Sequence, residues 1–162
     1  MTFGYNAAAA FGNSMSDFED HARDLLSSLV DRRQRDDEMQ RPLIFIAHSL
    51  GGIIVKQALI SARVDPKHQS INEHTIGIVF LGTPHRGSQT AAYASPLASI
   101  ATFVMNVQRP SLVQALKLNS DELLKLTSNF RHELNKYNVV SFYERRRTGI
   151  GRVSTVVSVT SV

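Results

Sequence analysis

The stretch that decides the fold is "RPLIFIAHSLGGIIVKQAL", residues 41–59, where two apolar runs are separated by "HSLGG" at residues 48–52. Residues 43–47 are continuously apolar, few in number and preceded by Pro42, which predicts a strand buried on both faces. Residues 51–62 predict a helix. A strand, a sharp turn around a serine and a helix together form a nucleophile elbow, so Ser49 is the predicted nucleophile.

The residues around Ser49 fit that interpretation. The turn holds its serine in a strained conformation, so the residues two positions away must be small, and here they are Ala47 and Gly51. Because a helix N-terminus directs backbone N–H groups at developing negative charge, the Leu50 N–H is the predicted first oxyanion donor. The alternative is an ordinary strand–turn–helix with an incidental serine. We expect His48 to pack against the sheet, because a triad base normally arrives from a distant loop.

The remaining pattern alternates strands with helices. Thr75–Leu81 predicts a second buried strand, residues 139–143 a third and residues 153–159 a weaker fourth, while "TFGY" at residues 2–5 resembles the end of a strand. Ser16 and Glu19 form a capping box that predicts the start of a helix, and another helix is expected from about Ser120. This alternation predicts a mostly parallel sheet in an α/β fold.

Composition excludes several classes of protein. The 162 residues contain no cysteine, which excludes disulfides and thiol catalysis and favours an intracellular, cytoplasmic location. There is no apolar run long enough to span a bilayer and no signal peptide, although association with a membrane or organelle stays open. Most of the net charge of +4 comes from arginines after residue 144. Since no nucleic-acid motif accompanies them, they predict a solvated loop and no nucleic-acid partner.

"FIAHSLGGIIVKQAL" followed by "GIVFLGTPHRGS" resembles the α/β-hydrolase lipase family that includes the serine-active-site-containing proteins, with GPI inositol-deacylases as more distant relatives. The version found in fungal proteins is the most similar, and "TFGYNA" and "VVSFYE" also match. The resemblance covers most of residues 2–147. It implies a single, incomplete α/β-hydrolase domain over residues 1–162, with a lid-like helical insert at about 88–136. It also implies hydrolysis of carboxylic esters through an acyl-enzyme on Ser49, without a metal or organic cofactor.

The resemblance suggests roles for two further side chains. Glu144 follows "VVSFY", where such folds place the acidic member of the triad, although a surface charge paired with a neighbouring arginine is the alternative. His85 is expected to shape the pocket rim. The family's catalytic histidine should follow the acid, yet histidines occur at positions 21, 48, 68, 74, 85 and 132 only.

The strands with a His-Gly loop that open the family pattern are also missing, so we expect a family member truncated at both ends. Two functions therefore compete. One is a lipase- or esterase-like serine hydrolase acting on an ester or lipid, and the other is a catalytically degenerate interaction or signalling module. The oligomeric state stays open.

Overall fold

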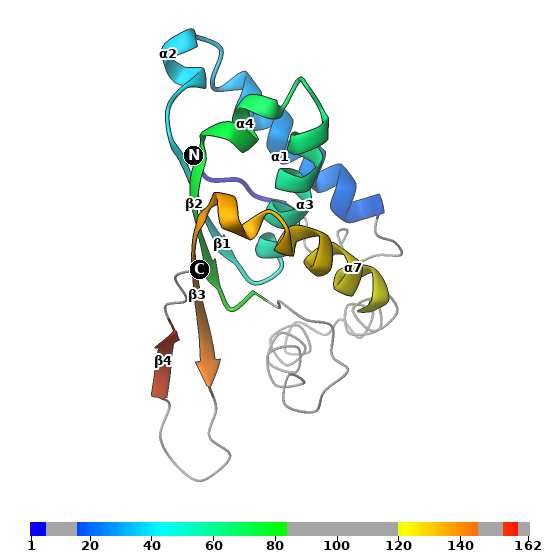
Figure 1. Cartoon of the computed structure of the whole chain (residues 1–162), viewed down its shortest axis with the longest axis vertical. Helices are drawn as coiled ribbons and strands as arrows, with labels where there is room; N and C mark the ends of the chain where they lie inside the picture. Colours follow the sequence, from blue (N-terminus) through cyan, green and yellow to red (C-terminus); the bar gives the residue numbers. More distant parts are fainter. Residues whose placement is uncertain (6–15, 84–119, 146–153, 159–162) are drawn as a thin grey trace.

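The computed structural model describes residues 1–5, 16–83, 120–145 and 154–158 (Figure 1). Four strands form one sheet in the order β1 (Leu43–His48), β2 (Thr75–Leu81), β3 (Asn138–Arg145) and β4 (Ser154–Ser158). β1, β2 and β3 are parallel, whereas β4 runs antiparallel to β3. The chain therefore has a partial α/β-hydrolase fold. The predicted β2 is confirmed, and β3 is longer than predicted at both ends.

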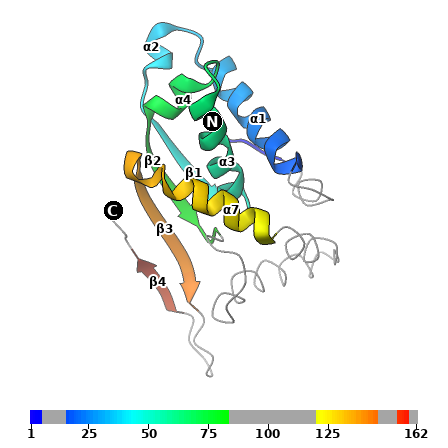
Figure 2. The same cartoon turned by 45° about the vertical axis from the view of Figure 1, so that its right-hand side comes forward.

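The helices lie on the same side of the sheet in both views (Figures 1 and 2). They are α1 (Ser16–Asp31), α3 (Gly51–Val64), α4 (Gln69–His74) and α7 (Ser120–Arg131), with a 3-10 turn at Leu134–Lys136. The starts predicted for α1, α3 and α7 are confirmed, whereas α4 was missed because its six residues are mostly polar. No helix of the described residues is both long and apolar enough to cross a membrane.

The core fills the space between the sheet and these helices. On the sheet, Ala47, Ile78 and Phe80 are buried beneath the helices, and Phe45 and Ile78 are register partners. The buried helical side chains are Phe18, Ala22, Leu25, Leu26 and Leu29 of α1, with Ile53, Ile54, Ala58 and Leu59 of α3 and Leu126 and Phe130 of α7. Phe130 meets Phe80 edge to face at 6.5 Å and stacks with Tyr137 at 6.3 Å, which fixes α7 over β2.

The opposite face of β1 is open, which corrects the prediction of a strand buried on both faces. Ile44 and Ile46 are 59% and 73% exposed, and the side chain of His48 is exposed on the same face. Apolar side chains favour burial, but a strand is buried on both faces only where other elements pack on both sides of the sheet. In the described ranges, the helices supply that packing on one side only.

The N-terminal residues also differ from expectation. Residues 2–5, predicted as the end of a strand, join no strand of the described sheet. Phe3 and Tyr5 nevertheless pack against the buried core. The aromatic side chains of "TFGY" therefore contribute packing instead of strand pairing.

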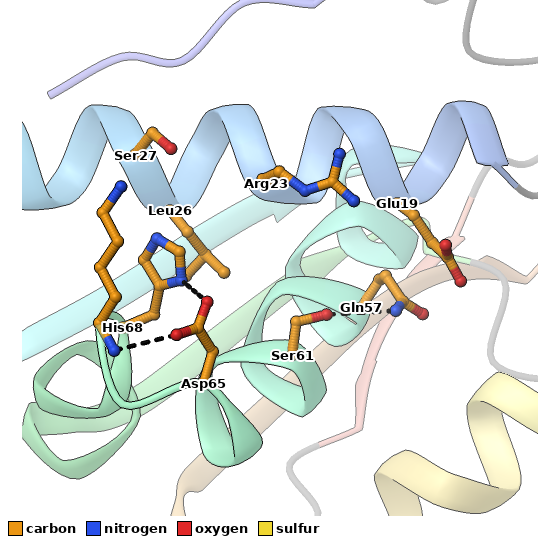
Figure 3. A pocket seen from close by; sticks show the side chains of 9 residues that line it. Glu19, Arg23, Leu26, Ser27, Gln57, Ser61, Asp65 and His68 are labelled. Carbon is orange, nitrogen blue, oxygen red and sulfur yellow. Dashed lines mark hydrogen bonds and ion pairs between the residues drawn. The ribbon is translucent and has the colours of Figure 1, made fainter.

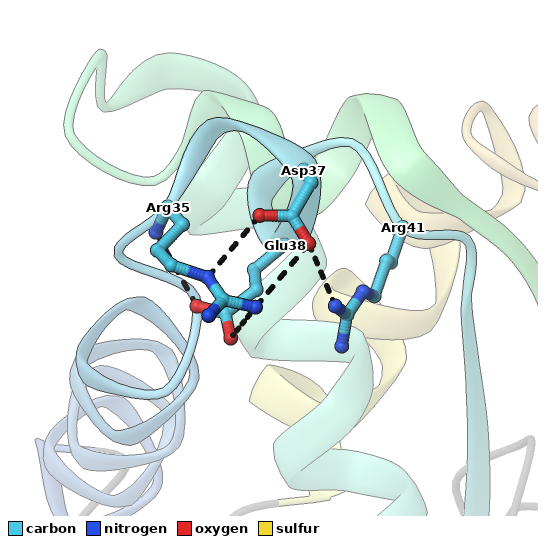
Figure 4. A network of polar contacts seen from close by, with 4 residues as sticks. All are labelled: Arg35, Asp37, Glu38 and Arg41. Carbon is cyan, nitrogen blue, oxygen red and sulfur yellow. Dashed lines mark hydrogen bonds and ion pairs between the residues drawn. The ribbon is translucent and has the colours of Figure 1, made fainter.

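The charged segment after α1 forms a small exposed network around α2 (Asp36–Met39) (Figure 4). Asp37 pairs with Arg35 at 3.2 Å and with Arg41 at 2.8 Å. These side chains are largely exposed, so the pairs contribute little to stability. Arg33, just after α1, is instead buried, and its side chain donates to the carbonyl of Met39. This hydrogen bond ties the end of α2 to the end of α1.

Candidate active site

Ser49 lies between the end of β1 and the start of α3, and its backbone has φ 52°. It is the one non-glycine residue with positive φ among those the structure describes. Such a conformation costs of order 1–3 kcal/mol and persists only where the surroundings impose it. Here the Ser49 N–H donates to the carbonyl of Leu81 at 2.8 Å, which ties the turn to the end of β2.

The turn leaves two backbone donors unengaged at the start of α3. The N–H groups of Gly52 and Ile53 donate to the carbonyls of Ser49 and Leu50 at 3.2 and 2.9 Å. Those of Leu50 and Gly51 have no backbone acceptor in the described part of the chain. Because they lie at the positive end of a 14-residue helix, they can stabilise an oxyanion formed beside Ser49.

The two glycines of "HSLGG" differ in how much room a side chain would have. A Cβ on Gly52 would lie 2.2 Å from the hydroxyl oxygen and 2.8 Å from the Cβ of Thr83, which follows β2 and is itself buried. A Cβ on Gly51 would lie 3.8 Å from the Tyr5 ring and hydroxyl, an ordinary contact. Gly52 is therefore required so that α3 can start against the end of β2, whereas Gly51 is sterically replaceable.

Lys56 lies one turn further along α3 and is 1% exposed. Its Nζ lies 5.5 Å from the centroid of the Phe80 ring and has no hydrogen-bond acceptor among the described residues. Burial lowers its pKa to about 8, since a low-dielectric environment disfavours the ammonium form. Lys56 was not among the residues predicted from the sequence, although a single lysine among the apolar residues of "IIVKQAL" is a signal for a buried cation.

No described histidine is hydrogen-bonded to Ser49 as its general base would be. His48 was expected to pack against the sheet, but its side chain is exposed on the open face, so that expectation is wrong. His21 contacts the ring of Tyr5 at 5.6 Å, and His74 bonds to the carbonyl of Ser70 through Nδ1 at 2.9 Å. His132 is exposed beyond the end of α7, as expected.

The fifth described histidine belongs to a different cleft. His68 is buried, and its Nδ1 lies 2.8 Å from the Asp65 carboxylate in a groove of about 450 Å³ between α1 and α3 (Figure 3). The N–H of Lys67, and then the ring of His68, hold the pKa of Asp65 below its ordinary value. Asp65 follows the last residue of α3, and a helix of 14 residues is about 21 Å long. This acid–histidine pair therefore lies at the opposite end of α3 from Ser49.

The structure describes the backbone of Glu144 but not its side chain. The residue lies inside β3 instead of after the strand, and its register partner is Thr155 of β4. β2 ends at Leu81, the partner of Phe142, so β3 carries Glu144 about 7 Å beyond the end of β2. His85 and the predicted insert up to residue 119 lie outside the described residues.

The described side chains contain no group of three or more His, Asp or Glu residues arranged to hold a metal ion. Among the described residues, the groups at the C-terminal ends of β1 and β2 are the hydroxyls of Ser49 and the buried Thr83 and the free N–H groups of Leu50 and Gly51, with the Lys56 ammonium buried beside Phe80. These groups suit nucleophilic attack with stabilisation of an oxyanion.

Residues 1–145 match the model of the PGAP1-like alpha/beta domain family, so the chain belongs to that family. It is similar to Protein SERAC1 of Danio rerio, with 34% identity over 123 residues, which are 74% of this chain and 18% of that protein. It is also similar to Protein SERAC1 of Mus musculus and of Homo sapiens, with 32% and 31% identity over 112 residues, or 68% of this chain and 16% of each protein. The chain therefore spans less than a fifth of the length of these relatives. No solved structure matches it.

Proposed function

We propose that the chain is a serine hydrolase of carboxylic esters, lipase- or esterase-like, in which Ser49 forms an acyl-enzyme. The observation that supports this is the left-handed backbone of Ser49 at a strand-to-helix junction. A strained serine in that place costs stability and is the hallmark of a nucleophile elbow. The family match gives the same hydrolase-type fold.

In the proposed reaction, Ser49 Oγ forms a bond to the acyl carbon while its proton passes to a base. The electrons of the carbonyl double bond move to oxygen, and the free N–H groups of Leu50 and Gly51 stabilise that oxyanion. Collapse expels the alcohol, which takes up a proton, and water then releases the acid from Ser49. Glu144 is proposed as the acidic group and His85 as part of the pocket rim.

The proposal includes the more specific features that the resemblance implies. These are a fungal-type member related more distantly to the inositol deacylases and an ester or lipid as substrate. Composition adds two further proposals, an intracellular location and no nucleic-acid partner. The apolar segment after residue 96 is proposed as part of a lid.

A non-catalytic interaction module is the second candidate, and the placement of the histidines favours it. None of the five described histidines is hydrogen-bonded to Ser49. Without a base, a serine hydroxyl stays un-ionised and weakly nucleophilic, and loss of one triad member lowers rates by several orders of magnitude. Even as an enzyme, the chain is therefore expected to react slowly.

A fluorophosphonate probe tests the proposal, because it phosphonylates activated serines without needing a matched substrate. We expect slow labelling of the wild type at Ser49, found by peptide mass spectrometry, and none in Ser49→Ala. Ser61→Ala is the matched control, since Ser61 lies in α3 with its hydroxyl bonded to Gln57 at 3.3 Å. Labelling of folded wild type that survives Ser49→Ala, or no labelling over days, would contradict catalysis and favour the module.

A further inference from the structure

The face of α3 that packs against β2 carries a charged group close behind the elbow. Gly52 and Lys56 are four residues apart in α3, so they lie on the same face of the helix. Gly52 approaches Thr83 just beyond the end of β2, and the Nζ of Lys56 lies 5.5 Å from the centroid of the Phe80 ring of that strand. The Lys56 side chain therefore lies in the seam between α3 and β2.

The register of the sheet shows how far this ammonium lies from the elbow. Phe80 is the partner of Ala47 in β1, and Ala47 precedes Ser49 by two residues. Two residues of a strand span about 6.6 Å, and the ammonium lies to one side of the strand, beside the Phe80 ring. Its distance from the Ser49 hydroxyl is therefore on the order of 10 Å.

The two buried polar side chains in this seam have no hydrogen-bond partner among the described residues. They are Lys56, which is 1% exposed, and Thr83, which is 6% exposed. Buried polar groups are nearly always hydrogen-bonded, and an ammonium taken from water without a partner destabilises the folded chain. A methionine would fill the same space without this cost. Groups that lower stability in this way are concentrated at functional sites.

The geometry excludes direct contact between Lys56 and the reacting atoms. A general base must lie within about 2.6–3.2 Å of the group whose proton it takes. The Lys56 Nζ forms no hydrogen bond to Ser49 or to any other described residue, and its burial keeps it from touching a substrate. Its charge can still act on the elbow, because a low dielectric inside the protein screens charges less than water does.

We propose that the buried ammonium of Lys56 stabilises negative charge at Ser49 through its electric field. The N–H groups of Leu50 and Gly51 contact the oxyanion, whereas Lys56 acts from behind the first turn of α3 and keeps its proton throughout. At about 10 Å and an effective dielectric constant of about 20, two unit charges interact strongly enough to change an equilibrium or a rate about tenfold. The consequence for catalysis rests on the proposed reaction at Ser49, but the field itself can be measured without it.

A thiol in place of the Ser49 hydroxyl measures this field without any catalysis. The chain has no cysteine, so Ser49→Cys carries a single thiol, and the pH dependence of its alkylation by iodoacetamide gives the pKa of that thiol. We expect this pKa to be about one pH unit higher in the double variant with Lys56→Met, because the thiolate loses a nearby positive charge. An unchanged thiol pKa would overturn the proposal.

Two further variants separate the charge of Lys56 from its packing and from net charge. Lys56→Arg keeps the charge, so the thiol pKa should stay within about 0.3 of its value in Ser49→Cys alone. Arg63→Met removes a half-exposed cation about 20 Å from Ser49 along α3, and solvent screening should keep its effect below about 0.3. A rise in either variant as large as that of Lys56→Met would assign the effect to packing or to net charge and refute the proposal.

Labelling by the fluorophosphonate probe measures the consequence at the serine itself. Lys56→Met should be labelled about tenfold more slowly than wild type at pH 7, although it should be the more stable protein. Labelling as fast as wild type would refute a role in the reaction. If wild type is not labelled and Lys56→Met still raises the pKa of the thiol, the proposed hydrolase function fails while the electrostatic coupling of Lys56 to the elbow is supported.

Discussion

Gly52→Ala should disrupt the elbow more than any other change of one methyl group near Ser49. The added Cβ would lie 2.2 Å from the Thr83 hydroxyl oxygen, 2.3 Å from its methyl carbon and 2.8 Å from its Cβ. Rotation of the Thr83 side chain can relieve the first two contacts. The third is fixed by the backbone, so α3 or residue 83 must move by roughly 0.6 Å to restore an ordinary contact of 3.4 Å.

That movement has two measurable consequences. Overpacking of this kind costs about 1–3 kcal/mol, which chemical denaturation followed by circular dichroism detects. Displacement of the first turn of α3 also shifts the free N–H groups away from Ser49. Because a misplacement near 1 Å costs up to about 10² in rate, we expect labelling of Ser49 to slow about tenfold or more.

Two variants test the reasoning. Gly51→Ala makes the same chemical change one residue earlier, where the Cβ meets Tyr5 at 3.8 Å, so stability should change by less than about 0.5 kcal/mol. Thr83→Gly removes all three clashing atoms, so the double variant should show a favourable coupling of about 1–3 kcal/mol with Gly52→Ala. If Gly52→Ala matched wild type, or if Thr83→Gly failed to rescue it, the close approach of α3 to residue 83 would be wrong.

The remaining predictions concern buried charges. Lys56 has a folded-state pKa of about 8, below its ordinary 10.5, so the unfolded chain binds more protons between these values and stability should rise with pH through that window. Lys56→Met should therefore raise the free energy of unfolding at pH 7 by about 2 kcal/mol, with an upper limit of about 3 kcal/mol. In urea titrations this gain should shrink between pH 8 and 10.5. A gain that stayed constant or grew with pH would refute the buried-ammonium assignment. Glu133 is buried and pairs with the half-exposed Arg63 and Lys136 at 2.7 and 2.8 Å, so Glu133→Gln should cost only about 1 kcal/mol because both cations can rehydrate. A double-mutant cycle with Arg63→Met measures the coupling, and a value above about 3 kcal/mol would show a dry ion pair instead.

Local sequence determined the parts of the fold that depend on neighbours along the chain. Short apolar runs next to a glycine pair or a cap predicted β1, β2 and the starts of α1, α3 and α7, because strand and helix periodicity is a local property. The elbow was predictable for the same reason. Small residues on both sides of a serine between a strand and a helix specify one tight turn, and the φ of Ser49 agrees with it.

Packing between distant segments decided the rest. "IIVKQAL" predicts a helix, but the position of Lys56 over Phe80 depends on how α3 lies against β2, 24 residues later. The pairing of His68 with Asp65 is local, yet its separation from Ser49 follows from the length of α3. Residues 2–5 were predicted as the end of a strand but join no strand of the described sheet, because pairing needs an adjacent partner that residue pattern does not reveal.

β1 shows most clearly what local sequence determines and what tertiary packing decides. Its six residues by themselves determine an apolar strand, and the "SLGG" that follows determines the sharp turn around Ser49. Tertiary structure decides that Phe45 and Ala47 face the helices and that Ile44 and Ile46 face outward. The physical reason is that hydrophobicity is a property of each side chain, whereas burial depends on which other segments reach that side chain.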